Sequence, residues 1–122
     1  MKRVLDVGQC NPDHASISAL LTSRFEVEID RTHQHADAME AVKSQTYDLV
    51  LINRLLDRDH SEGAQILQDI KSDPALAKIP VMIVSNFADA QAAAVALGAE
   101  PGFGKSALNA PETIAALEKF LA

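Results

Sequence analysis

Short apolar segments alternate along the chain with longer segments in which apolar residues recur at helical spacing. Four apolar segments lie at residues 2–8, 47–53, 80–85 and 102–104, and residues 25–30 alternate apolar with acidic side chains. Apolar runs of this length are typical of buried strands, and strict alternation is typical of a strand with one solvent-exposed face. The pattern predicts five strands, with 47–53 at the centre of the sheet and 25–30 at an edge.

The segments between these strands predict five helices. The first begins at Pro12 with Asn11 as its N-cap, because proline is favoured in the first helical turn and asparagine can accept from free backbone N–H groups. The remaining helices are expected at residues 35–45, 61–72, 88–97 and 111–121. The side chains expected to face the core are Ile17, Leu20, Leu21, Ala36, Met39, Val42, Ile66, Leu67, Ile70, Ile114, Leu117, Phe120 and Leu121.

Strands and helices alternate strictly in this prediction. Right-handed crossovers between parallel strands place helices on both faces of a sheet. The expected fold is therefore α/β and flavodoxin-like, a doubly wound sheet of five parallel strands in the order 2-1-3-4-5 with five helices. Its 122 residues suit a single domain, 1–122, which could be one domain of a longer protein.

Composition narrows the classes of function. Apolar residues make up 48% of the chain, and the net charge is −6 with no basic run, which argues against nucleic-acid binding. The lone Cys10 excludes an internal disulfide and fits a reducing compartment. No apolar run approaches the roughly 20 residues of a membrane span, and the N-terminus lacks the apolar region of a signal peptide. We expect a cytoplasmic protein without membrane contact.

Candidate site residues lie where the predicted strands end. Asn53 ends the central strand, Ser85 ends the next one, and Lys105 follows 102–104. Ligands of open α/β sheets bind outside the carboxyl ends of the strands, so Asn53 should lie at the ligand crevice. Asp6 stands inside the first strand, where a buried carboxylate is costly unless it is paired.

These segments resemble the receiver domain of response regulators from bacterial two-component systems. The resemblance covers essentially the whole chain and rests on Tyr47–Asn53, on Ile79–Ser85 and on Leu97–Lys105. It implies a phosphoacceptor position at Asn53, a hydroxyl position at Ser85 and a lysine position at Lys105. Receivers have an aspartate where this chain has Asn53, so the resemblance also implies a receiver without its acceptor.

Other receiver positions are altered as well. The two acidic residues that help receivers hold Mg²⁺ correspond here to Gln9 and Cys10, or to Gly8 and Gln9 if the turn carries an insertion. The position of the aromatic switch residue is Gly102, with Phe103 beside it. Mg²⁺ prefers carboxylate oxygens, and an amide cannot accept a phosphoryl group as an aspartate does. We therefore expect a degenerate pocket that holds no metal or cofactor and catalyses no reaction.

The sequence thus favours a signalling module that binds proteins without being phosphorylated. Its partner, another protein or a second copy of the chain, is expected on the face formed by the helix 88–97, the strand 102–104 and the helix 111–121. An alternative is a phosphorylated receiver with an atypical acceptor such as Asp57. A further alternative is a small flavodoxin-like ligand-binding protein, although Gly8-Gln-Cys-Asn-Pro is a poor phosphate-binding loop.

The remaining reactive side chains have ordinary interpretations. Cys10 near a helix N-terminus could be redox-active, but a plain small residue in a turn explains it. His33 and His35 are two residues apart, so they should point to different sides and not form a metal site. His14 and His60 appear isolated in the sequence.

Overall fold

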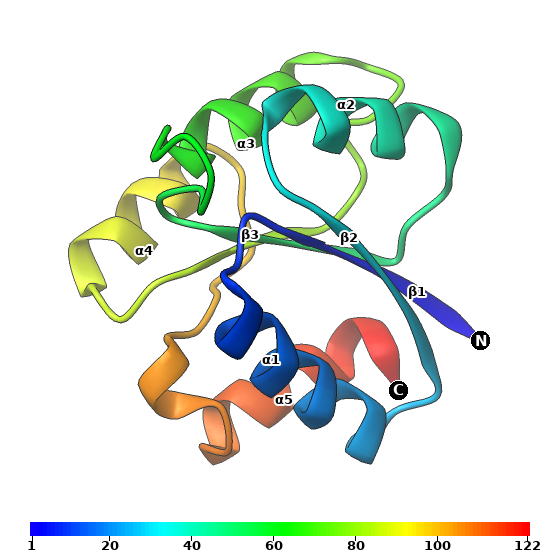
Figure 1. The fold of residues 1–122 in the computed structure, drawn as a ribbon, viewed down its shortest axis with the longest axis vertical. Coiled ribbons are helices and arrows are strands. Elements are labelled where there is room, and N and C mark those ends of the chain that lie inside the picture. Colours follow the sequence, from blue (N-terminus) through cyan, green and yellow to red (C-terminus); the bar gives the residue numbers. More distant parts are fainter.

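The computed structural model describes residues 1–122 and contains a four-stranded parallel sheet in the order β2-β1-β3-β4 (Figure 1). The strands are β1 (Lys2–Val7), β2 (Val27–Thr32), β3 (Leu49–Asn53) and β4 (Val81–Val84). Each pair is in parallel register, for example Val4 opposite Leu49 and Val50 opposite Val81. The predicted doubly wound fold and the order of its first four strands are confirmed.

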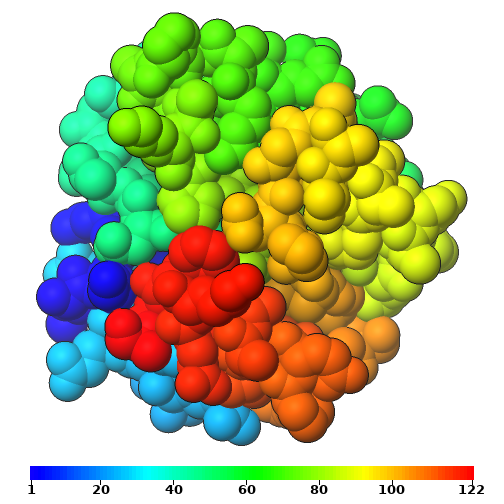
Figure 2. All heavy atoms as spheres, turned by 180° about the vertical axis from the view of Figure 1, so that it is seen from behind, coloured from blue at the N-terminus to red at the C-terminus, as the bar shows by residue number.

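Five helices cover the two faces of the sheet. They are α1 (Asn11–Arg24), α2 (His35–Ser44), α3 (Gly63–Ser72), α4 (Ala88–Ala96) and α5 (Pro111–Leu121). In Figure 1, α1 and α5 lie on one face, α2 and α3 on the other, and α4 beside α3. The chain termini lie at the same end of the molecule, and Figure 2 shows α5 beside the start of β1. No helix is long and apolar enough to cross a membrane.

The central strand β3 is buried on both faces, as predicted. Leu49 and Leu51 pack against the cluster under α1 and α5, whereas Val50 and Ile52 pack against the cluster under α2 and α3. All four side chains are fully buried. Each such side chain contributes about 2 kcal/mol to folding, so β3 anchors both layers and fixes the place of Asn53 at its end.

The predicted fifth strand is reduced to a single bridge, so the segment 102–104 was wrongly expected to be a regular strand. Phe103 pairs with Val84, and its carbonyl accepts from the Ser85 N–H at 3.0 Å. The Gln91 side chain of α4 takes the place of further main-chain pairing: it donates to the Ile83 carbonyl at 2.8 Å and accepts from the Gly102 N–H at 3.0 Å. The segment still lies beside β4, where a fifth strand would lie.

Several details of the helices differ from the prediction. Cys10, not Asn11, is the N-cap of α1, and it caps without a side-chain hydrogen bond to the helix backbone. In α2 the buried residues are Ala38 and Val42, whereas Ala36, two positions before Ala38, lies on the opposite side of the helix and is exposed. In α5 the fully buried positions are Thr113, Leu117 and Leu121, whereas Ile114 and Phe120 pack at the margin of the core.

Candidate functional site

A polar cavity of about 230 Å³ opens at the carboxyl ends of β3 and β4. Asn53, Ser85 and Lys105 are among its lining residues, so the structure brings together the three side chains that end successive elements. The others are Arg54, Leu55, Val84, Asn86 and Phe87. The cavity is thus built by the loops that follow β3 and β4 and by the 3₁₀ turn (Lys105–Ala107).

Asn53 is held at the cavity floor from two sides. Its Nδ2 donates to the Gly8 carbonyl at 2.9 Å, and its Oδ1 accepts from Lys105 Nζ at 3.4 Å. Gly8 can present that carbonyl because it adopts a φ of +74°, a left-handed conformation that other residues rarely reach. A carboxylate at position 53 would place an oxygen against this carbonyl, so the local contacts suit an amide.

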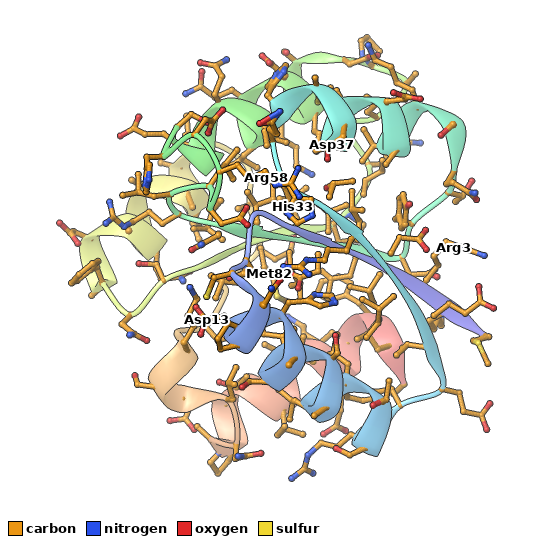
Figure 3. The ribbon with its side chains drawn as sticks, viewed as in Figure 1. Arg3, Asp13, His33, Asp37, Arg58 and Met82 are labelled. Atoms are coloured by element: carbon orange, nitrogen blue, oxygen red, sulfur yellow. The ribbon has the colours of Figure 1, made fainter.

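Lys105 has a second partner that sequence reasoning missed. Its Nζ lies 2.7 Å from the Asp13 carboxylate in the first turn of α1. Figure 3 shows Asp13 at the start of α1, facing the turn that contains Lys105. The hydrogen bond from Lys105 holds the pKa of Asp13 below its usual range. The available signal was an acid two residues after Asn11, in the first turn of the helix.

Ser85 uses its hydroxyl within its own loop. The side chain is only 8% exposed, and its Oγ accepts from the Phe87 N–H at 3.1 Å. Asn86 next to it accepts from the N–H of Ser106 at 3.1 Å. These bonds tie the loop after β4 to the turn after Lys105, and they close this side of the cavity without a ligand.

Gln9 and Cys10 flank the cavity and do not line it. Gln9 is fully buried, and neither polar atom of its amide has a hydrogen-bond partner of good geometry. Cys10 is exposed and donates from Sγ to Asp13 at 3.2 Å. Neither residue adds a carboxylate to the site.

The positions expected to carry a switch are packed. A side chain at Gly102 would collide with the Ile83 carbonyl and with the Gln91 amide. Phe103 is buried in the cluster under α1 and α5. An aromatic ring therefore has no room to move in and out at position 102, and the ring at 103 is part of the core.

A second polar cluster lies on the α1 side of β1 and was not foreseen. Fully buried Asp6 accepts from or shares a proton with His14 Nδ1 at 2.6 Å, so His14 is not isolated. Burial raises the pKa of Asp6, and the hydrogen bond and charge of His14 act in the opposite direction. Arg31, opposite Asp6 on β2, adds a weaker attraction. The signal was present in the sequence as a carboxylate in a strand that needed a partner.

The other histidines pair separately with acids. His33 Nδ1 lies 3.3 Å from Asp57, and His35 Nε2 lies 2.6 Å from Asp69. His33 lies beneath α2 near the loop after β3, from which Arg58 projects (Figure 3). No group of three or more His, Cys, Asp or Glu side chains is placed to hold a metal ion.

The polar groups of Asn53, Ser85 and Lys105 in the cavity are already engaged in hydrogen bonds or an ion pair within the chain. They offer an amide, a hydroxyl that already accepts a hydrogen bond, and an amine paired with Asp13. Mg²⁺ prefers carboxylate ligands, and none of the residues that line the cavity carries one; the Asp13 carboxylate is paired with Lys105. Phosphoryl transfer needs a nucleophile and electrostatic stabilisation of the transferred group, and an amide at position 53 supplies no acceptor.

The fold has clear relatives among solved structures, although the sequence matches no protein-family model and no curated protein significantly. A Chloroflexus aurantiacus protein assigned as a response regulator is 15% identical with a TM-score of 0.85, covering 98% of this chain and 96% of that one. The signal receiver domain of a DNA-binding response regulator from Colwellia psychrerythraea 34H is 27% identical with a TM-score of 0.76, covering 98% and 99%.

The receiver domain of NtrX from Brucella abortus is 19% identical with a TM-score of 0.75, and the match covers 97% of both chains. The three matches extend over nearly the whole chain and agree on one architecture. This protein therefore has the fold of response-regulator receiver domains.

Proposed function

We propose that this domain is a receiver-like signalling module that acts through protein contacts without aspartyl phosphorylation, bound Mg²⁺ or enzymatic activity. The observation that carries the proposal is Asn53 at the receiver acceptor position, bonded to Gly8 and Lys105. The amide removes the nucleophile, and its contacts hold the strand end in one conformation. A fixed pocket of this kind presents the same surface at all times.

The charges around Lys105 support the same proposal. In a pocket with three carboxylates, each pair repels by roughly 4 kcal/mol at 4 Å and an effective dielectric near 20, and a metal ion offsets that repulsion. Here Lys105 meets one carboxylate, Asp13, at 2.7 Å. The pair neutralises itself, so the closed arrangement needs neither a cation nor a phosphoryl group.

The proposed contact surface is the face of α4, the segment 102–104 and α5. Helix α4 is almost free of charge, and Ala94 is its only buried residue. Val95 and Leu97 are exposed on or beside it. An apolar helix that leaves most of its surface to solvent is suited to burial against a protein partner or a second copy of the chain.

Asp57 is a weaker candidate for an atypical phosphoacceptor. Its carboxylate faces His33, and it is not among the residues that line the cavity with Ser85 and Lys105. A phosphoryl group there would lie beside an imidazole without the hydroxyl and the amine. This alternative predicts that the wild-type chain gains the mass of one phosphoryl group from a small-molecule phosphodonor and that the Asp57→Ala variant does not.

An amide NMR titration with Mg²⁺, followed by beryllofluoride as a phosphoryl mimic, tests the proposal. We expect no saturable shifts at Asn53, Ser85 or Lys105. Saturable shifts at these amides would overturn it. The matched control is a triple variant with Asn53→Asp, Gln9→Asp and Cys10→Asp. If this variant folds, its restored carboxylates should give Mg²⁺-dependent shifts. A second control, a phosphorylatable receiver domain, confirms that the beryllofluoride mimic is active.

Self-association tests the proposed surface separately. Sedimentation equilibrium of the wild type, of Val95→Asp on α4 and of Ala36→Asp on α2 compares two exposed apolar positions. If a second copy is the partner, Val95→Asp shifts the protein to monomer and Ala36→Asp does not. Equal behaviour of the two variants removes α4 from a self-interface.

A further inference from the structure

Arg54 and Phe87 form a stacked pair on the surface between the loops that follow β3 and β4. The guanidinium lies over the Phe87 ring, 5.2 Å from its centroid, although the ring is 57% exposed. Stacking on an aromatic face leaves the edge of the guanidinium, with its N–H donors, free to bind. The pair thus combines an aromatic face with guanidinium donors at the protein surface.

Arg54 also differs from the other partly buried cations. Five Lys and Arg side chains are partly buried, and four of them donate to oxygen atoms. Their acceptors are Asp30 for Arg3, the Gln9 carbonyl for Arg31, the Ala77 and Ile79 carbonyls for Lys71, and Asp13 for Lys105. Arg54 makes no ion pair or side-chain hydrogen bond within the chain, so its donors remain available to an outside acceptor.

An apolar groove of about 180 Å³ begins at the same arginine and runs between α3 and α4 over β4. Ile83 and Leu97 contribute the larger apolar side chains, and alanines contribute the rest. The volume is comparable to the cavity of about 150 Å³ that accommodates a benzene ring in an engineered protein. The groove therefore has room for one aliphatic side chain of a partner.

We propose that Arg54, Phe87 and this groove bind a partner segment in which an Asp or Glu side chain lies close to an aliphatic one. The carboxylate binds the guanidinium through paired hydrogen bonds, and the aliphatic side chain enters the groove. Glu62 lines the groove without pairing with Arg54, so an anion is accepted at the arginine end only. Arginine is enriched at interface hot spots, where a partner fills a pocket and excludes water from it.

This site lies on the α3 side of α4. Arg54 and Phe87 also line the Asn53 cavity, and Leu97 also belongs to the exposed apolar surface of α4. The inference rests on the proposed function only in that the domain acts through a protein partner. It does not require that the Asn53 cavity lacks phosphorylation or Mg²⁺ binding. Saturable shifts with Mg²⁺ would overturn the proposed function and leave this inference standing. The failure of the peptide experiment below would do the reverse.

Selection from a random twelve-residue peptide library, followed by NMR titration of the wild-type chain with the enriched peptide, tests the inference. We expect enriched peptides to share an acid within four positions of Leu, Ile or Val. Their binding should shift the amides of Arg54, Phe87 and Leu97. Enrichment without that pattern, or shifts that map elsewhere, would overturn the proposal.

Paired variants separate binding from folding. Arg54→Ala should weaken the enriched peptide at least tenfold, whereas Arg58→Ala, an exposed arginine of the same loop, should leave it within twofold. Ala93→Leu should block the groove, whereas Ala92→Leu, exposed on α4 and not lining the groove, should not. Chemical denaturation of each variant verifies folding, and equal loss in both members of a pair contradicts the proposal.

Inorganic phosphate distinguishes a peptide site from a simple anion site. We expect phosphate to compete with the enriched peptide only weakly, because it cannot fill the groove. If phosphate displaces the peptide fully and Ala93→Leu has no effect, the surface binds anions alone and the proposal fails.

Discussion

Two polar regions lie near the carboxyl end of β1, and they differ in whether they contain a buried carboxylate. The cavity at Asn53 has a neutral amide at its floor and one partly exposed ion pair, Lys105 with Asp13. The cluster on the α1 side of β1 encloses a carboxylate, Asp6, that is fully buried and bonded to His14.

The difference shows what a carboxylate requires in each place. A buried ion costs several kcal/mol of desolvation, and it is retained only where a fixed partner offsets that cost. Asp6 has that partner within its own chain, eight residues away on α1. A carboxylate at position 53 would face the Gly8 carbonyl and would need a cation from solution, and this chain has an amide instead.

The largest effect is expected from His14→Ala. The substitution leaves the Asp6 carboxylate buried without its closest partner, which should lower the free energy of unfolding by about 3 kcal/mol at neutral pH. Urea denaturation measures the change. The matched control is Ser18→Ala. The Ser18 hydroxyl lies one turn further along α1 and 3.4 Å from His14 Nε2, a long hydrogen bond whose loss should cost little. A loss below 1 kcal/mol for His14→Ala would mean that Asp6 is solvated or neutral.

The pH dependence of Asp6 has a defined sign. Its folded pKa is raised above the ordinary 3.8, chiefly by burial. The folded protein therefore binds the Asp6 proton more tightly than the unfolded chain does. The stabilisation from protonated Asp6 is complete below the ordinary carboxyl pKa, and it is lost as pH rises through the folded pKa. Denaturation curves of the wild type and Asp6→Asn across this window should converge at low pH and differ most above it.

Asn53→Asp should have an intermediate effect. It replaces the donor that binds the Gly8 carbonyl by an acceptor and gains attraction to Lys105, with a net loss of about 1 kcal/mol. Stability measured with and without excess Mg²⁺ should be the same, because Gln9 and Cys10 supply no carboxylates. Stabilisation by Mg²⁺ in this single variant would show that one added carboxylate is enough for the pocket to bind metal.

The smallest effect is expected from Asp13→Asn. The pair with Lys105 is partly exposed, so its loss should cost about 0.5 kcal/mol. The pKa of Asp13 is lowered by Lys105, so its contribution is present above the ordinary carboxyl value and is lost as pH falls through the folded pKa. This sign is opposite to that of Asp6. A stability difference between wild type and Asp13→Asn that persists at low pH would argue against the ion pair.

Sequence patterns were sufficient for the layers of the fold, because strand periodicity and topology decide them, and the resemblance to receiver domains grouped Asn53, Ser85 and Lys105. The patterns did not identify the pairs Lys105–Asp13 and Asp6–His14. Those pairs depend on where the first turn of α1 lies over the sheet, a tertiary relation that no local spacing records. The fifth strand was overestimated because Gly102 and Gly104 allow the chain to follow β4 without forming a ladder.

The Gln91 side chain has a consequence for the protein in a crowded solution. The outer edge of β4 would otherwise expose the Ile83 carbonyl, and Gln91 occupies that acceptor while binding the Gly102 N–H. An unpaired edge is a template for strands of other molecules and a route to aggregation. The Gln91 amide thus replaces part of a strand and prevents the sheet from pairing with a strand of another molecule. At the opposite edge, β2, the charges of Glu28 and Asp30 disfavour such pairing.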